Sequence, residues 1–248
     1  MVKLYTALLL VLIAFNAAAQ LSDSVSTSSL DVRTGWRHYL LNDEIGSNLN
    51  YAGSSAPIFL AYSKSKKARL REWQLIYDAP TLSNTFNESF LDGAFVLIQY
   101  GQLFKTSWLS KKNLSVQLGG NLKSVLFVRN FNVVRSGFDN TTGESASSLN
   151  LHGRLIKSFN AKHTFVYDLQ IALVGYVYGT QFNGSGTGDL LTLDTLTDIS
   201  NSLSYQIRLG DVVDFLVQYN FRYYQHQRVN TVEYGTQEIL AGLKFKFK

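Results

Sequence analysis

The chain has 248 residues, of which 17% are charged and 46% apolar, with no cysteine and only two prolines. The formal charge of +5 comes without a basic stripe or a nucleic-acid reading motif, so nucleic acid is not expected as a partner. The absence of cysteine excludes disulfides, thiolate metal ligands, cysteine nucleophiles and a lipid-attachment residue. The length suits one large domain.

The N-terminus has the parts of a secretory signal peptide: a basic residue, an apolar run over 4–15, and the small residues of Ala17–Ala19. The run is shorter than the roughly 20 residues of a membrane-spanning helix, which is the alternative interpretation. We therefore predict a signal peptide over 1–19. Residues 20–29 are rich in Ser, Thr and Asp and are predicted to form a flexible periplasmic tail, followed by a β-barrel over 30–248.

Ten strand-like segments follow along the chain with apolar and polar side chains in alternation, and the fourth is the least regular because residues 95–98 are all apolar. They lie at about 30–39, 55–63, 69–78, 90–104, 113–128, 149–155, 163–178, 202–209, 213–226 and 234–247. Strict alternation puts the two sets of side chains on opposite faces of a strand. The sequence therefore predicts an all-β fold of about ten strands, with eight or twelve as the alternatives.

The segment 213–226 shows this alternation most clearly. Its odd positions from Val213 to Tyr223 are all apolar or aromatic, whereas Gln218, Asn220 and Arg222 occupy even positions. The run is longer than the usual strand of a soluble protein, and its aromatic residues gather toward one end of the apolar face. This pattern is typical of a strand whose apolar side meets lipid.

The connections between segments alternate between short and long. Those at about 64–68, 105–112, 160–162 and 210–212 are mostly short, and those at 42–54, 80–89, 129–147, 179–200 and 227–233 are mostly longer. Outer-membrane barrels have short periplasmic turns and longer extracellular loops, with an even number of strands. The order predicts periplasmic termini and extracellular long loops. Lysines gather in the short turns, either because exposed turns are solvated or because they touch anionic inner-leaflet headgroups.

The last segment carries apolar side chains at every second position. These are Ile239, Ala241, Leu243, Phe245 and Phe247. With this ending, the chain resembles the small bacterial outer-membrane β-barrels of the porin-like superfamily, in which such a strand is the assembly signal read by the barrel-insertion machinery. Lys248 departs from that pattern, because the aromatic residue normally ends the chain. The resemblance implies a closed antiparallel transmembrane up-and-down barrel in the outer membrane, in contact with phospholipid and lipopolysaccharide.

The alternation assigns side chains to two surfaces. The predicted lipid-facing set contains Phe165, Tyr167, Leu169, Ile171, Phe215, Val217, Tyr219, Phe221, Leu243 and Phe245. The predicted charge network of the lumen contains Arg33, Arg37, Glu72, Asp92, Arg154, Asp168, Arg208, Asp214, Arg222 and Glu238. Because a lone buried charge loses several kcal/mol of hydration, we expect Asp168 or Glu238 to pair with an arginine and the pair to help close the lumen.

No motif selects a catalytic, metal or cofactor site. The histidines His38, His152, His163 and His226 have no nucleophile placed beside them by a local pattern, and no two have metal-ligand spacing. Asp189, Asp194 and Asp198 would hold Ca²⁺ only with oxygen ligands from elsewhere. No cofactor is predicted. A serine and a histidine at the barrel rim, as in a lipid hydrolase or acyltransferase, are the enzymatic alternative.

About ten strands enclose little open water. We therefore predict a structural, binding or partner-docking component of the outer membrane, with outer-membrane lipids, the barrel-insertion machinery and another outer-membrane protein complex as candidate partners. A narrow pore or transport component for small solutes is the first alternative, and a lipid-modifying enzyme is the second.

Overall fold

The computed structural model describes residues 26–44, 47–84, 89–133, 138–180, 186–227 and 231–247. The predicted signal peptide over 1–19 lies outside these ranges. Among the described residues, no helix has the length and apolar character needed to cross a membrane.

The described residues form antiparallel strands almost throughout. The strands are β1 (Thr27–Asp43), β2 (Ser47–Ser55), β3 (Ile58–Lys66), β4 (Arg69–Asp78), β5 (Thr81–Asn84), β6 (Ser89–Lys105), β7 (Leu114–Val133), β8 (Phe138–Ser158), β9 (His163–Thr180), β10 (Gly186–Thr192), β11 (Leu196–Arg208), β12 (Val213–Gln227) and β13 (Thr231–Phe247).

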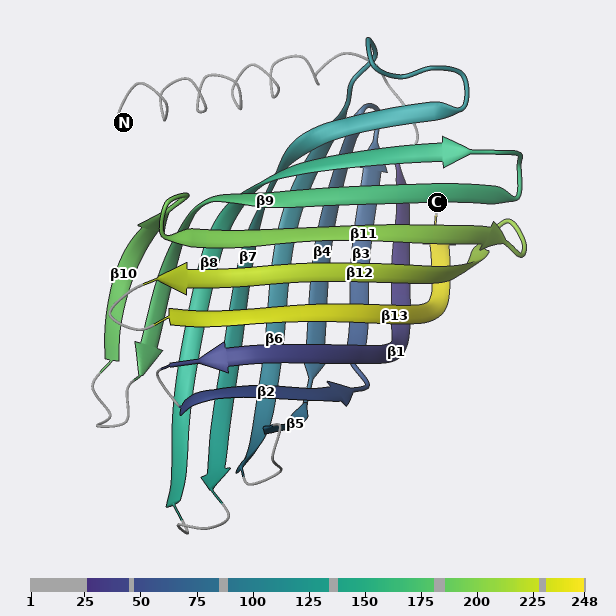
Figure 1. Ribbon diagram of the computed structural model, residues 1–248. Coiled ribbons are helices and arrows are strands. Elements are labelled where there is room, and N and C mark those ends of the chain that lie inside the picture. Colours follow the sequence, from purple (N-terminus) through teal and green to yellow (C-terminus); the bar gives the residue numbers. More distant parts are fainter. Residues whose placement is uncertain are drawn as a thin grey trace.

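Ten of these strands form a ring of pairings, in the order β1, β3, β4, β6, β7, β8, β9, β11, β12 and β13. The ring returns to its start because β13 pairs with β1, from Ser28 opposite Phe247 to Asp43 opposite Val232. In Figure 1 the strands of the near wall cross those of the far wall, as tilted barrel strands do. The prediction of an all-β antiparallel fold with ten strands is confirmed.

The three shorter strands extend positions of this ring. β2 continues β3 across Ala56 and Pro57, and β5 continues β4 across Ala79 and Pro80. Proline has no N–H to give to a strand ladder, so each proline interrupts its strand. Beyond the interruptions β2 pairs with β1 and β5, and β5 pairs with β6. β10 likewise precedes β11, and both pair with β9. The chain therefore has ten ring positions.

The ring has two distinct ends. The short connections between β3 and β4, β6 and β7, β8 and β9, and β11 and β12 share one end, which we call the turn end. Thr27 and Phe247 also lie there, because Thr27 pairs with Ser65 and Ser28 pairs with Phe247. The opposite end, where β7 and β8 are joined, is the loop end.

The strands reach further toward the loop end than the sequence predicted. β7 runs to Val133 and β8 starts at Phe138, within the predicted loop 129–147. Outside an apolar belt both faces of a strand can be polar, so the two-residue pattern that reveals a strand is lost. β1 also starts earlier, at Thr27, so the last three residues of the predicted tail over 20–29 belong to the barrel.

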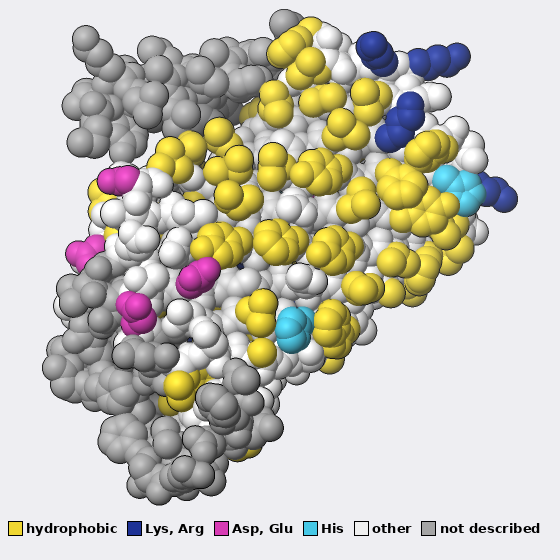
Figure 2. Space-filling model, in the orientation of Figure 1, with side chains coloured by type: hydrophobic (Ala, Val, Ile, Leu, Met, Phe, Trp, Pro, Cys, Tyr) yellow, Lys and Arg dark blue, Asp and Glu magenta, His cyan; other side chains and the backbone are white. Residues whose placement is uncertain are grey.

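The outer face of the ring is largely apolar. Figure 2 shows hydrophobic side chains over the middle of this view, with basic side chains toward one end and acidic ones toward the other. The ten residues predicted to face lipid lie on outward positions of β9, β12 and β13, and those on β9 and β12 alternate mostly with buried residues. The five residues of the predicted assembly signal share the outward face of β13, and Ile239 is the most exposed large apolar side chain among them.

Candidate functional site in the barrel interior

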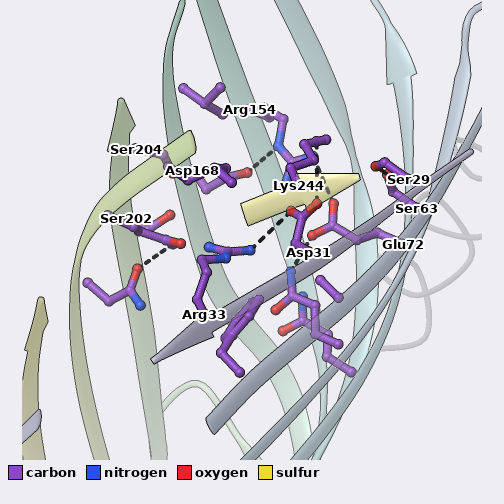
Figure 3. A pocket seen from close by; sticks show the side chains of 18 of the residues that line it. Ser29, Asp31, Arg33, Ser63, Glu72, Arg154, Asp168, Ser202, Ser204 and Lys244 are labelled. Carbon is purple, nitrogen blue, oxygen red and sulfur yellow. Dashed lines mark hydrogen bonds and ion pairs between the residues drawn. The ribbon is translucent and has the colours of Figure 1, made fainter. Parts of the chain in front are cut away.

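The interior is hollow in its turn-end half. A cavity of about 780 Å³, which we call the cup, has Arg37, Lys123 and Tyr234 at its inner end and Ser65 and Asp211 near the short connections. Figure 3 shows side chains from several strands pointing into it, with Ser29 and Ser63 side by side. The cup therefore opens at the turn end.

Beyond the cup, aromatic rings fill the loop-end half. We call Tyr39, Phe95, Phe127, Tyr224 and Tyr234 the aromatic plug. The rings of Phe127 and Tyr234 are 6.2 Å apart, centroid to centroid, and they come from β7 and β13, which stand opposite each other in the ring. Tyr39 packs on Phe95 at 6.4 Å, and Tyr224 stacks on Tyr234 at 4.7 Å. Aromatic contacts thus extend across the full width of the barrel.

Every ring position contributes a fully buried side chain to this half. One from each of the ten positions, none more than 3% exposed, is Leu41, Tyr51, Leu82, Leu91, Phe131, Thr142, Val177, Leu196, His226 and Val232. Close packing requires small residues where rings need space. A Cβ on Gly93 would lie 2.8 Å from the ring of Phe127, so a side chain there would displace the plug.

A charged triad lies between the cup and the plug. The Asp198 carboxylate accepts two hydrogen bonds from Arg222, both 3.0 Å, and two from Lys123 Nζ at 3.1 and 3.2 Å. All three side chains are buried. Lys123 on β7 and Asp198 on β11 are not ring neighbours, so the pair crosses the interior. The sequence had placed Asp198 in an extracellular loop, which is wrong.

A second charged group joins four strands, β1, β2, β4 and β13, around Arg37. Its guanidinium lies 3.1 Å from Asp78 Oδ2 and 2.9 Å from Glu238 Oε1. Asp78 also accepts hydrogen bonds from the hydroxyls of Tyr39 at 2.8 Å and Ser55 at 2.6 Å. Charge-assisted bonds of this kind are about twice as strong as neutral ones. They tie β1, β2, β4 and β13 together directly beneath the plug.

A third group surrounds Arg154 at the wall of the cup (Figure 3). Arg154 Nη1 lies 2.8 Å from Glu72 Oε2, and Arg154 Nε donates to Asp168 Oδ1 at 2.6 Å. His152 Nε2 lies 2.7 Å from the same Asp168 oxygen. The expected pairing of Asp168 or Glu238 with an arginine is therefore confirmed for both acids. Arg222, however, pairs with Asp198 and not with an acid on a later strand.

A fourth group closes the loop-end half. Glu144 on β8 lies 3.3 Å from Arg129, accepts a hydrogen bond from the Tyr224 hydroxyl at 3.0 Å, and lies 3.2 Å from His226 Nε2. β8 and β12 are separated by two strands in the ring. The sequence had assigned Glu144 to a loop, so this crossing contact was missed.

Two members of the predicted lumen network lie outside the buried charge groups. Asp92 is exposed on the outer face of β6 and accepts a hydrogen bond from Thr81 at 2.9 Å. Inward positions near it on β6 are apolar, as at Leu91 and Phe95, so a rule that places charges inside fails there. Arg208 is exposed at the mouth of the cup, outside the buried groups. The other eight residues are buried or, in the case of Arg154, half-buried.

The four histidines do not share a site. His152 and His226 belong to the interior groups, and His163 lies 2.6 Å from the Tyr205 hydroxyl near the turn end. His38 lies on the outer face, where its Nδ1 is 3.2 Å from Ser54 Oγ and its ring stacks on Trp36. This serine–histidine contact was not predicted by any local motif.

Asp189, Asp194 and Asp198, which the sequence offered as calcium ligands, form no cluster within the described residues. Asp198 is occupied by Lys123 and Arg222, whereas Asp189 and Asp194 are exposed. Within the described ranges no group of three or more His, Asp or Glu side chains is arranged to hold a metal ion.

The ring of ten antiparallel strands, apolar outside and charged inside, is the fold of the bacterial outer-membrane β-barrels. The outer-membrane protease OmpT of Escherichia coli matches 92% of this chain and 99% of its own, with a TM-score of 0.63 and 8% identity. The translocator domain of the autotransporter NalP from Neisseria meningitidis matches 95% of this chain and 93% of its own, with a TM-score of 0.52 and 9% identity. No family model and no curated protein matches the sequence. At such low identities the likeness shows the fold alone.

Proposed function

We propose that this chain is an integral protein of the bacterial outer membrane whose barrel is sealed in its loop-end half and open as a cup at its turn end. In this proposal it acts as a structural, binding or partner-docking component and not as an open pore. The observation that carries the proposal is the complete cross-section of buried side chains, one from each ring position.

The outer surface supports the membrane location. Large apolar side chains such as Trp36, Leu122 and Ile239 are about half exposed on outward positions, which is costly in water and favourable in lipid. The turn end then faces the periplasm and the long connections face outward. In this arrangement the outward face of β13 is presented to the barrel-insertion machinery, and phospholipid and lipopolysaccharide cover the apolar belt.

Buried aromatic and ionic contacts oppose the passage of an ion through the barrel. A permeating ion would have to displace Phe127 from Tyr234 and separate the carboxylates of Asp78 and Glu238 from Arg37. Breaking one side of a buried charge pair costs about 3 to 5 kcal/mol. The transport alternative therefore requires a rearrangement of the plug.

Conductance in planar bilayers tests the seal. The wild-type barrel is expected to give no steady ohmic steps, because the aromatic plug closes its full width. The double variant Phe127→Ala and Tyr234→Ala removes the two rings that meet across the barrel and is expected to conduct. The matched control is Tyr167→Ala with Tyr219→Ala on the outer face, which should stay silent. Steady conductance of the wild type would replace this proposal with the transport alternative.

The contact between His38 and Ser54 keeps an enzymatic alternative open. A base within hydrogen-bonding reach of a hydroxyl is the minimum for an activated serine, and a third group normally orients the base. Among the described residues, the recorded contacts of His38 are with Ser54 and Trp36, and neither is an acid. We expect folded protein in phospholipid vesicles to release no fatty acid above the level of Ser54→Ala. Release that depends on Ser54 and on His38 would establish a lipid hydrolase.

A further inference from the structure

The cup has two chemically different walls. Its apolar wall contains Phe59, Ile76 and Leu97, which are partners in register across β3, β4 and β6. Phe95 lies beside Leu97 on β6, and all four side chains are buried. Ligand pockets in proteins are mostly apolar, with a few placed polar groups. One wall of the cup therefore offers a continuous surface for a nonpolar face.

The opposite wall consists mainly of neutral polar side chains. Ser202 and Ser204 come from β11, Gln218 and Asn220 from β12, and Gln170 from β9. In the ring order β11 stands opposite β4, β12 opposite β6, and β9 opposite β3. Figure 3 shows Ser202 and Ser204 on the far side of the cup from Ser63 and Glu72. Hydroxyls and amides both donate and accept hydrogen bonds, so this wall matches a ligand that does the same.

The buried charges of the cup are already paired with one another, whereas Arg208 and Asp211 at its mouth are exposed. Asp31 lies 3.3 Å from Arg33, Glu72 and Asp168 lie within 2.8 Å of Arg154, and Glu238 lies 2.9 Å from Arg37. An ionic ligand would have to compete with these internal partners, and breaking a buried pair is costly. The cup therefore favours an uncharged ligand.

Eight buried polar atoms among the cup's lining residues have no hydrogen-bond partner within the described part of the chain. They are Arg33 Nε, Arg37 Nε, Arg222 Nη1, the Tyr234 hydroxyl, Asp31 Oδ1, Glu72 Oε2, Gln117 Oε1 and Gln218 Oε1. An unsatisfied buried polar group costs about 1 to 3 kcal/mol. Three of these atoms are nitrogen donors, four are oxygen acceptors and the Tyr234 hydroxyl is either, so this part of the lining calls for both kinds of hydrogen-bond partner.

We infer that the cup is a binding site for a short, uncharged oligosaccharide that enters from the turn end. The inference rests on the proposed function, because it needs a sealed barrel with a cup open to the periplasm. Sugar hydroxyls both donate and accept, as the polar wall requires, and the C–H face of a sugar ring packs on the wall formed by Ile76 and Leu97, since the Arg33 guanidinium already covers the Phe59 ring at 3.8 Å. The volume of about 780 Å³ lies within the range of small-molecule pockets.

A peptide is a poorer fit for this cavity. Extended peptides commonly bind by adding a strand to a free sheet edge. Each of the ten ring strands pairs on both sides within the described residues, and β10, which pairs with β9 alone, lies at the loop end away from the cup, so the cup presents no such edge. A carbohydrate needs no edge, because its own hydroxyls reach side chains.

The test is isothermal titration of the folded protein in lauryldimethylamine oxide, a detergent without a sugar headgroup. The probes are maltotriose and tri-N-acetylchitotriose, with triaspartate as an acidic peptide probe. We expect saturable binding of at least one trisaccharide and none of triaspartate. Ser202→Phe fills the cup and should weaken trisaccharide binding at least about tenfold. Ser124→Phe makes the same change on the outer face of β7 and should leave it unchanged.

Gln218→Leu provides a second variant if Ser202→Phe does not fold, and it should also weaken binding because it removes one of the unpartnered acceptors. Absence of trisaccharide binding, binding that neither cup variant changes, or preference for triaspartate would overturn the inference. A sealed wild-type barrel that binds no sugar refutes only the ligand class. A conducting wild-type barrel refutes the proposed function instead.

Discussion

Asp198→Asn is expected to destabilise the folded barrel by about 3 to 5 kcal/mol, because Lys123 and Arg222 would both stay buried without a counter-charge. The wild-type carboxylate accepts four hydrogen bonds from these two cations, and a neutral amide cannot replace its charge. The measurement is the free energy of unfolding in urea for protein folded into lipid vesicles. Tryptophan fluorescence reports it, since Trp36 and Trp73 lie on the outer face.

Two comparison variants separate the loss of this counter-charge from a general loss of stability. Asp194→Asn makes the same change on an exposed residue between β10 and β11 and should stay within about 0.5 kcal/mol of wild type. The triple variant Lys123→Met, Asp198→Leu and Arg222→Met removes all three charges and should recover most of the lost stability, because buried ion pairs can be replaced by packed apolar side chains. An unfolding midpoint of Asp198→Asn equal to that of wild type would show that the triad contributes no net stability.

The sequence could predict the barrel wall because lipid and lumen impose opposite chemistry on alternate side chains. Val217 and Gln218 are neighbours in the chain, yet one is 39% exposed on an apolar surface and the other is buried against the cup. That contrast repeats from β1 to β13. Short turns also alternate with long connections, because the chain returns to the same side after each pair of strands and such barrels have short turns on one side only. Ten ring positions follow from these two patterns.

The same signal is absent where the strands leave the apolar belt. On β8, Thr142 and Glu144 point inward while Thr141 and Ser145 point outward, so both faces are polar and the segment looks like a loop. The sequence therefore missed Glu144 as an interior residue, and Asp198 at the start of β11 for the same reason. Alternation also fails at Asp92, where a short stretch of β6 has apolar side chains inside and a carboxylate outside.

The sequence also could not predict which charged side chains pair with one another across the interior. Asp168 or Glu238 was expected to pair with an arginine, but the sequence did not indicate which one: Glu238 pairs with Arg37, and Arg222 pairs with Asp198. Which acid meets which base depends on how far the strands are staggered around the ring. That stagger also brings Phe127 onto Tyr234, and so it decides where the plug ends and the cup begins.

Val217→Arg is expected to impair insertion of the barrel, because Val217 lies within the outward apolar run between Phe215 and Phe221 on β12. An arginine near the middle of a lipid-facing barrel surface costs about 2 to 4 kcal/mol. The measurement is the folded fraction after dilution from urea into phospholipid vesicles, followed by resistance of the folded band to unfolding in detergent without heating. The variant should fold less completely and unfold at lower urea than wild type.

Gln218→Arg is the matched control, since it places the same side chain one residue further along on the opposite face. There the new guanidinium enters the cup, where water and the carboxylate of Glu238 near Asn220 are within reach of a long side chain. Gln218→Arg should therefore fold to nearly the wild-type extent, and its loss of folded fraction should be much smaller than that of Val217→Arg. Equal losses from the two variants would mean that the inner and outer faces of β12 are assigned wrongly. The cup and the plug, which both depend on that assignment, would then have to be placed again.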